Sequence, residues 1–257
     1  MIPTLLELGP LPVRSFGLMI ALALFAGVIR LGMSLARYGI DPRIAERYVT
    51  AAGISGLVGA RFWFIVENWS YVKEDLFGAI FSSAGFTFYG GFIIATGVVY
   101  VMARRDGVPI ARFCDALGPT LALGYAIGRL GCQLAGDGDY GDATTGFWGM
   151  SYSTGVVPTL PGERVYPTPL FESLISLAMT WVLLSVEQTA HILSKPLQRF
   201  GLYLTLLSVE RIVVEVFRIN PEVLWRLSEA QVIGIALCLS GILMIIVSQV
   251  RYRAQRV

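Results

Sequence analysis

The sequence has little charge for its length. Charged residues make up 15% of its 257 residues, hydrophobic residues make up 55%, and the mean hydropathy is +0.65. A soluble core of this length needs much more polar surface, since roughly a quarter of an average soluble domain is charged. Disorder is excluded as well, because a disordered chain has too few apolar residues to collapse. The composition therefore predicts a helical protein that crosses a membrane several times.

Histidine and cysteine are scarce. The single histidine, His191, excludes any mechanism that needs two histidines. The three cysteines, Cys114, Cys132 and Cys238, form neither a CxxC pair nor a Cys/His cluster, so no disulfide framework and no zinc site is predicted. The net charge of +2 is spread thinly and gives no reason to expect nucleic acid as a partner.

Seven apolar runs are long enough to cross a bilayer, which takes about 20 residues. Helices are expected, because backbone groups in lipid must bond within their own segment. The first run follows no basic segment and precedes no small-residue cleavage site, so we expect a retained span rather than a cleaved signal peptide. The runs cover residues 13–33, 48–66, 86–103, 113–131, 169–186, 200–217 and 230–250.

Lysine and arginine are distributed unequally between the two sides of these spans. The segments 34–47, 104–112 and 187–199 and the C-terminal tail fall on the same side of the predicted spans and contain eleven lysines and arginines. The segments on the other side contain five. Basic loops stay in the cytoplasm, so the N-terminus is predicted outside and the C-terminus inside. We thus expect an all-α, polytopic membrane protein of about seven helices, with residues 1–257 forming a single transmembrane domain.

One outer segment, at about 132–167, is long and rich in Gly, Asp, Thr and Tyr. A structureless loop of this length in a compact protein is usually functional. Its acidic, glycine-rich run begins at Asp137, but Trp148 occupies the twelfth position, where a calcium loop needs glutamate. We expect a functional insertion here, with no metal and no cofactor.

Several ionisable residues lie inside the apolar runs. A charge near the bilayer centre costs at least about 2.5–3.5 kcal/mol, and it normally faces the bundle interior, pairs with another charge and marks function. The alternative is an ion pair that only fixes helix register, which has most weight for residues near span ends, such as Asp115 and Arg61. Among them are Arg61, Asp115, Arg129, Glu172, Glu210, Arg211 and Glu215.

Several of these charges are predicted to meet near the outer leaflet. Arg211 and Glu215 stand four residues apart on one helix face, and Arg218 continues that face at the outer end. Arg129 ends the fourth span and Glu172 opens the fifth, both at the outer side. Arginine forks bind phosphate through paired hydrogen bonds. The cluster therefore predicts a site for an anionic lipid headgroup.

Glycines recur at helical spacing in two places. Gly124, Gly128 and Gly131 fall at intervals of four and three, and the Gly90-Gly91 pair lies near the start of the third span. Small residues at such spacing are typical of close helix packing. The alternative is the close approach of a ligand to the backbone, and both interpretations stay open.

Several short motifs recur in an order that resembles one known family. They include Gly59-Ala60-Arg61, Tyr89-Gly90-Gly91, Gly128-Arg129-Leu130-Gly131, Tyr166-Pro167-Thr168-Pro169-Leu170-Phe171-Glu172, and Arg211, Glu215 and Arg218 on one helix. Their order and spacing, with the seven-span topology, resemble the bacterial prolipoprotein diacylglyceryl transferases over nearly the whole chain.

The resemblance implies an enzyme of lipoprotein biosynthesis in the bacterial plasma (inner) membrane. It would transfer a diacylglyceryl group from phosphatidylglycerol to the lipobox cysteine thiol of a prolipoprotein, at the outer leaflet. Gly90 and Gly91 are expected to line the headgroup pocket. The implied partners are phosphatidylglycerol, the prolipoprotein signal peptide and the bilayer, and we expect a monomer.

The resemblance also assigns roles to the charged cluster. Arg129 and Arg211 are expected to hold the lipid phosphate and to stabilise the charge that builds on it during the reaction. Glu172 and Glu215 are expected to orient these arginines, and Arg218 is expected to take part in lipid binding.

The sequence departs from the family pattern around the reacting centre. Tyr89 stands where the family has histidine, and Cys132 stands where it has asparagine. A base is still needed, since a thiol is mostly protonated near neutral pH and must lose its proton to attack. Tyr89 or Asp137 is expected to be this base, with Asp139 as an alternative.

Two other functions stay open. One is a paralogous membrane transferase with a different acceptor, in which Cys132 could carry the group covalently, although a buried cysteine usually behaves as a small hydrophobe. The other is a non-enzymatic protein that binds or transports an anionic lipid. Transport predicts polar groups through the whole depth of the bundle, whereas here they concentrate in the outer half, which favours interfacial chemistry.

Overall fold

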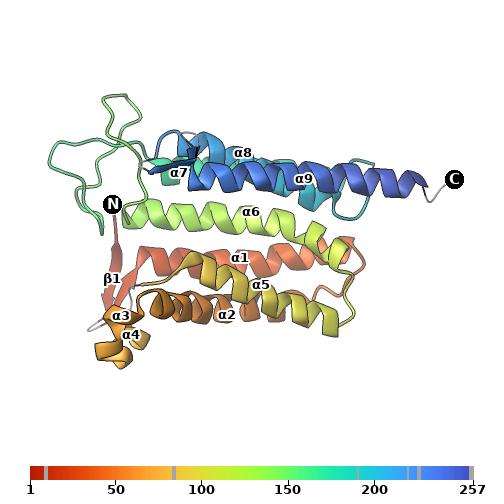
Figure 1. The fold of residues 1–257 in the computed structure, drawn as a ribbon, viewed down its shortest axis with the longest axis horizontal. Coiled ribbons are helices and arrows are strands. Elements are labelled where there is room, and N and C mark those ends of the chain that lie inside the picture. The colour runs from red at the N-terminus through yellow and green to blue at the C-terminus, as the bar shows by residue number, and fades with distance from the viewer. Residues whose placement is uncertain (9–10, 83–84, 190, 219, 225–226, 255–257) are drawn as a thin grey trace. The chain divides into compact units, whose positions relative to one another are not determined.

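The chain is mostly helical. A computed structural model describes residues 1–8, 11–82, 85–189, 191–218, 220–224 and 227–254 (Figure 1). Two arginines that enter the charge count above, Arg226 and Arg256, lie outside these ranges. The helices are α1 (Ser15–Arg37), α2 (Ile44–Glu67), α3 (Trp69–Val72), the 3₁₀ turn η1 (Lys73–Asp75), α4 (Leu76–Phe81), α5 (Phe88–Arg105), α6 (Ile110–Ala135), α7 (Thr168–Gln188), α8 (Gln198–Glu215) and α9 (Glu229–Ala254). Two short antiparallel pairs complete the fold: β1 (Thr4–Leu8) with β2 (Leu11–Arg14), and β3 (Glu222–Leu224) with β4 (Leu227–Ser228).

Each of the seven predicted spans coincides with a long helix. The first helix begins two residues later than predicted, because Val13 and Arg14 pair with β1. Within the described residues, α1, α2, α7 and α9 are long and apolar enough to cross a membrane. The helices α6 and α8 carry most of the intramembrane charges, which lowers their hydropathy. A helical membrane protein is therefore confirmed, and the number of seven crossings stays a prediction.

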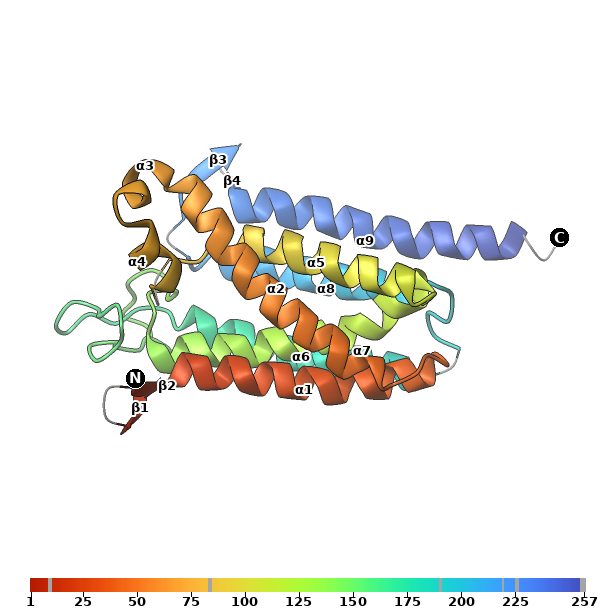
Figure 2. The ribbon, with the colours of Figure 1, turned by 90° about the horizontal axis from the view of Figure 1, so that it is seen from below.

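The chain divides into two compact units, residues 32–113 and residues 1–31 with 114–257. In the unit of residues 32–113, α2 and α5 pack closely through glycines (Figure 2). A Cβ atom on Gly91 would lie 2.7 Å from the carbonyl oxygen of Gly56, and one on Gly59 would lie 2.9 Å from that of Gly90. Such separations exclude any larger side chain, so close helix packing explains these glycines.

Arg61 has a structural role in the same unit. Its guanidinium donates to the carbonyl oxygen of Gly85 at 2.6 Å and to that of Ala79 in α4. A buried arginine that satisfies backbone carbonyls ties the segment after α4 to α2. The register-fixing interpretation is thus favoured for Arg61.

The larger unit contains α6, α7, α8, α9 and the first part of α1. Figure 1 shows α8 and α9 side by side, and a Cβ on Gly201 would lie 2.6 Å from the carbonyl oxygen of Gly241. Asp115 on α6 accepts from the backbone N–H groups of Leu197 at 2.7 Å and Phe200 at 2.8 Å. It therefore caps the N-terminus of α8, where the donors otherwise have no helical partner. The structural interpretation of Asp115 is favoured as well.

The predicted insertion is an ordered segment rather than a structureless loop. The backbone N–H of Val156 donates to Ala135 at 3.0 Å, so the segment folds back onto the end of α6. Tyr152 is completely buried, and its hydroxyl donates to Gln133 of α6 at 2.7 Å. Burial raises the pKa of Tyr152 to about 12. The insertion lies at the same end of this unit as the N-terminal strands (Figure 1).

Candidate active site

A cluster of charged side chains lies where α6, α7 and α8 meet the insertion. It contains three arginines and three carboxylates, which compensate one another in charge. We call it the arginine cluster, and all of its members belong to the larger unit. They are Arg129, Asp139, Glu172, Arg211, Glu215 and Arg218.

Glu172 is the centre of the arginine cluster. Its side chain is 0% exposed and pairs with all three arginines: with Arg129, with Arg211 at 3.0 Å and with Arg218 at 3.6 Å. The Tyr125 hydroxyl donates to the same carboxylate at 3.2 Å. A buried charge needs this degree of compensation, because an unpaired carboxylate in an apolar medium is strongly destabilising. The predicted role of Glu172, to orient the arginines, fits this geometry.

Glu215 is the second carboxylate that pairs with Arg211. Its Oε2 pairs with Arg211 at 3.1 Å, and its Oε1 accepts from Ser228 and from Asn220, each at 2.6 Å. Arg211 is thus fixed between two carboxylates on α7 and α8, while 30% of its side chain stays exposed. Part of the Arg211 side chain therefore remains open to a ligand.

Arg129 is the most enclosed of the three arginines. Its guanidinium pairs with Glu172 and Asp139 and lies 3.6 Å from the Cys132 sulfur. Its Nε atom is a buried donor without a hydrogen-bond acceptor in the described part of the chain. An unsatisfied buried donor costs about 1–3 kcal/mol, so an oxygen supplied by a ligand would stabilise it.

Asp139 and Asp137 have opposite electrostatic environments. Burial alone would raise the pKa of Asp139, but Arg129 and then Arg218 lower it below the ordinary value. Burial raises the pKa of Asp137, and a hydrogen bond with Cys132 only partly opposes this. Asp137 is therefore the better proton acceptor of the two.

The same acids and Cys132 lie close enough to hold a metal ion. The Cys132 sulfur and oxygens of Asp137 and Asp139 lie within 4.8 Å of one another. Arg129, however, contacts both Cys132 and Asp139, and its positive charge opposes a cation there. The donor set does not fit a metal.

Tyr89, Gly90 and Gly91 belong to the first turn of α5, in the smaller unit. Tyr89 is 53% exposed, and its ring meets that of Phe88 edge to face at 5.8 Å. Gly90 and Gly91 are buried against α2. Their predicted part in the site stays an expectation from the resemblance.

Gly124, Gly128 and Gly131, the second set of glycines at helical spacing, differ in their surroundings. A Cβ on Gly131 would lie 3.0 Å from that of Met19, which is helix packing. No described atom lies within 4 Å of a Cβ on Gly124 or Gly128. Packing therefore explains Gly131 alone, and the alternative of ligand approach stays open beside Arg129.

Three contacts near the arginine cluster are not evident from the sequence. Tyr125 stands one turn before Arg129, a spacing that could have indicated a shared face. Asn220 and Ser228 reach Glu215 from the turn between α8 and α9, and no local pattern marks them. Glu210, another of the intramembrane charges, accepts from Ser176 at 3.1 Å.

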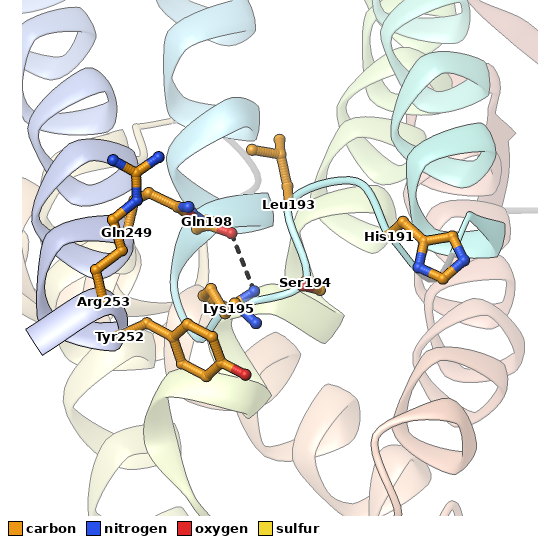
Figure 3. Close-up of a pocket in the computed structure, with 8 residues that line it drawn as sticks. All are labelled: His191, Leu193, Ser194, Lys195, Gln198, Gln249, Tyr252 and Arg253. Carbon is orange, nitrogen blue, oxygen red and sulfur yellow. Dashed lines mark hydrogen bonds between the residues drawn. The ribbon is translucent and has the colours of Figure 1, made fainter. Parts of the chain in front are cut away.

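A pocket of about 470 Å³ lies at the other end of this unit (Figure 3). Gln198 accepts from the backbone N–H of Lys195 at 3.0 Å, and the Lys195 ammonium lies 3.2 Å from the centre of the Tyr252 ring. His191 also lines it, but Figure 3 shows its ring pointing away from the other side chains. No carboxylate stands among the described residues of its lining, so the single histidine has no acidic partner there.

Arginines paired with carboxylates, at one end of an apolar helical bundle, define a membrane protein with a candidate anion site. Comparisons with known proteins agree with this class. A family model described as prolipoprotein diacylglyceryl transferase matches residues 3–247. The chain therefore belongs to the prolipoprotein diacylglyceryl transferase family, and the resemblance seen in its motifs is confirmed.

Individual relatives match over most of their length. A phosphatidylglycerol–prolipoprotein diacylglyceryl transferase of Dehalococcoides mccartyi is 30% identical over 239 residues, which cover 91% of this chain and 89% of the relative. One from Synechococcus elongatus is 29% identical over 247 residues, covering 94% and 85%. One from Leptospira interrogans is 28% identical over 235 residues, covering 81% and 72%.

Proposed function

We propose that this chain transfers the diacylglyceryl group of phosphatidylglycerol to the lipobox cysteine of prolipoproteins, at the outer face of the bacterial inner membrane. The observation that carries the proposal is the arginine cluster, in which Arg129 keeps a buried donor without an acceptor among the described residues. Family membership and the names of the relatives supply the two substrates.

The arginine cluster suits the phosphate of this lipid. Arg129 lies on α6, while Arg211 lies on α8 and Arg218 in the turn that follows it. All three are held by Glu172, so their N–H groups are oriented before the lipid arrives. Preorganised donors of this kind stabilise charge without reorganisation during the reaction. Arg129 and Arg211 are proposed as the main phosphate ligands, with Glu172, Glu215 and Arg218 in support.

The transfer exchanges one bond for another. The cysteine sulfur attacks the glycerol carbon of the diacylglyceryl group, and a C–S bond forms. The bond from that carbon to the phosphate oxygen breaks, and its electron pair stays on the departing glycerol phosphate. The arginines stabilise this developing charge.

The thiol proton goes to a base of the protein. Tyr89 and Asp137 are the proposed candidates. The raised pKa of Asp137 brings this carboxylate closer in basicity to a thiolate, which makes proton transfer less unfavourable.

For the membrane arrangement we propose seven crossings in one transmembrane domain, with the N-terminus outside and the insertion at about 132–167 on the outer side. In the larger unit, the N-terminal strands, the insertion and the turn after α8 gather at one end, while residues 191–199 and the C-terminal tail lie at the other (Figure 1). Over the whole chain, eleven of the sixteen lysines and arginines outside the spans lie in the segments that we assign to the second side, and this excess favours the cytoplasm for that side.

Cysteine labelling tests this topology. Single cysteines at Ser70 and Thr154, in a background without the native three, are expected to react with a membrane-impermeant maleimide in intact cells. A cysteine at Ser194 is expected to react only after lysis, because it lies in a basic cytoplasmic segment. All three positions are exposed, so access to the reagent is comparable. Labelling of Ser194 from outside would overturn the orientation.

Complementation tests the activity. A strain depleted of its own transferase is expected to grow when it expresses this chain, and mass spectrometry of a model lipoprotein should find the added diacylglyceryl group. The Arg211→Ala variant, expressed at equal level, serves as the inactive control. Growth failure with unmodified lipoprotein, while the purified protein binds phosphatidylglycerol, would favour a paralogue with another acceptor or a lipid-binding protein.

A further inference from the structure

Asp139 differs from the other two carboxylates of the arginine cluster. Its side chain is 40% exposed, whereas those of Glu172 and Glu215 are 0% and 2% exposed. Glu172 and Glu215 lie on helices, but Asp139 lies in the insertion, directly after Gly138 with its φ of +94°. Of the three carboxylates in the arginine cluster, Asp139 is thus the one that can be displaced from its arginines most easily.

The two oxygens of Asp139 join two different arginines. Oδ2 pairs with Nη1 of Arg129, and Oδ1 pairs with Nη2 of Arg218 at 3.3 Å. A phosphodiester likewise presents two free oxygens and one negative charge, and arginines bind both groups in the same geometry. Asp139 therefore occupies N–H groups that a phosphodiester would need.

We propose that Asp139 is an internal substitute for the lipid phosphate, which occupies Arg129 and Arg218 in the empty site and is displaced when a phosphodiester binds. The inference rests on the proposed function and adds a residue that sets the affinity of that site for its lipid. The exchange keeps the cluster neutral, so neither state leaves an uncompensated buried arginine.

The displacement needs little backbone movement. The carbonyl oxygen of Asp139 accepts from the Thr168 hydroxyl at 2.7 Å, which holds the backbone to the start of α7. Two residues later, the N–H of Gly141 donates to Tyr166 at 2.8 Å. Rotation of the exposed side chain is therefore sufficient to vacate the two arginines.

The Asp139→Asn variant tests the proposal. The full-length protein in detergent is titrated with dihexanoyl-phosphatidylglycerol. The variant keeps the shape of the side chain but not its charge, so its Kd is expected to fall at least about threefold, the scale of a partly exposed ion pair. Inorganic phosphate, titrated separately, is expected to bind more weakly and to show the same preference for the variant.

Asp142→Asn is the matched control. It removes the same charge from the same segment, but Asp142 is exposed and makes no ion pair with the described residues of the arginine cluster. Its Kd is expected to match that of the wild type. An equal gain in both variants would mean that only net charge matters, and the proposal would be wrong. If Asp139→Asn gives little folded protein, Asp139→Ser is titrated in its place.

The remaining outcomes separate this proposal from the proposed function. Unchanged or weaker binding by Asp139→Asn, with wild-type binding that Arg211→Ala abolishes, overturns the substitute role and leaves the lipid site standing. Unchanged binding with a large loss of turnover would instead identify Asp139 as the base. The absence of lipid binding by the wild type and both variants overturns the lipid site, and with it the role of Asp139.

Discussion

Replacing Arg129 or Arg211 with lysine is expected to lower both phosphatidylglycerol binding and turnover at least about tenfold, which corresponds to about 1.4 kcal/mol. Lysine keeps the positive charge but loses the planar fork that meets two oxygens at once. In this protein each guanidinium contacts at least two carboxylates, so one ammonium cannot replace its contacts. The loss is expected to be larger for Arg129, the more enclosed of the two.

Arg164→Lys is the matched control for these variants. Arg164 is an exposed arginine of the insertion, and its Nε donates to the carbonyl oxygen of Gly149 at 2.9 Å, outside the arginine cluster. Its replacement is expected to leave binding and turnover within about twofold, because exposed polar contacts contribute little. A general intolerance of lysine on the outer side would affect all three variants alike.

Stability measurements separate a ligand role from a register-fixing role. If the arginines only held the helices in register, their lysine variants would lose yield and melting temperature. Wild-type melting behaviour with reduced lipid binding is the expected result. Wild-type melting behaviour together with unchanged binding and turnover in either variant would contradict the assignment of the phosphate site.

The helices and the arginine cluster could be predicted from the sequence for a simple reason. Apolar runs of about 20 residues require helices in lipid, and the spacing of Arg211 and Glu215 follows the helical repeat. The sequence predicts Arg218 on the same helix face, but α8 ends at Glu215 and Arg218 lies in the turn that follows. Arg129 lies near the end of α6 and Glu172 near the start of α7, so the order of the spans alone brings them to the same end of the bundle. These predictions depend on local periodicity and on the bilayer, both of which are readable in a single sequence.

The partners outside the helices could not be predicted in the same way. Asp139 and Arg218 are 79 residues apart in the chain. Their contact depends on the path that the insertion takes in the folded protein. Asp115 and Arg61 stand out in the sequence as intramembrane charges, but their partners are backbone groups of distant segments. Backbone groups are the same in every residue, so no sequence pattern marks them as partners.

Tyr89→Phe is expected to abolish most turnover while lipid affinity stays nearly unchanged. Tyr89 stands where the family has histidine. The proposed role of its hydroxyl is in the chemical step rather than in lipid binding. An ordinary phenol has a pKa of about 10 and is a weak base near neutral pH. Asp137 is the alternative base.

The competing interpretation is an aromatic anchor at the membrane surface. Tyr89 is 53% exposed and lies beside Phe88, which stacks on Phe92, and tyrosine is enriched at membrane–water interfaces. An anchor would tolerate phenylalanine. Tyr100→Phe is the matched control, because Tyr100 lies on the same helix with 52% exposure and has no proposed role in the reaction.

The decisive measurement is transfer to a lipobox peptide by wild type, Tyr89→Phe, Tyr89→His and Tyr100→Phe, with lipid binding followed in parallel. Tyr89→His is expected to retain or raise turnover, since it restores the family residue, whose side chain ordinarily has a pKa of about 6.5. Wild-type turnover in Tyr89→Phe would mean that the hydroxyl takes no part, and Asp137 would become the leading base. If all four proteins bind the lipid and none transfers it to the peptide, the acceptor is a different molecule or the protein only binds the lipid.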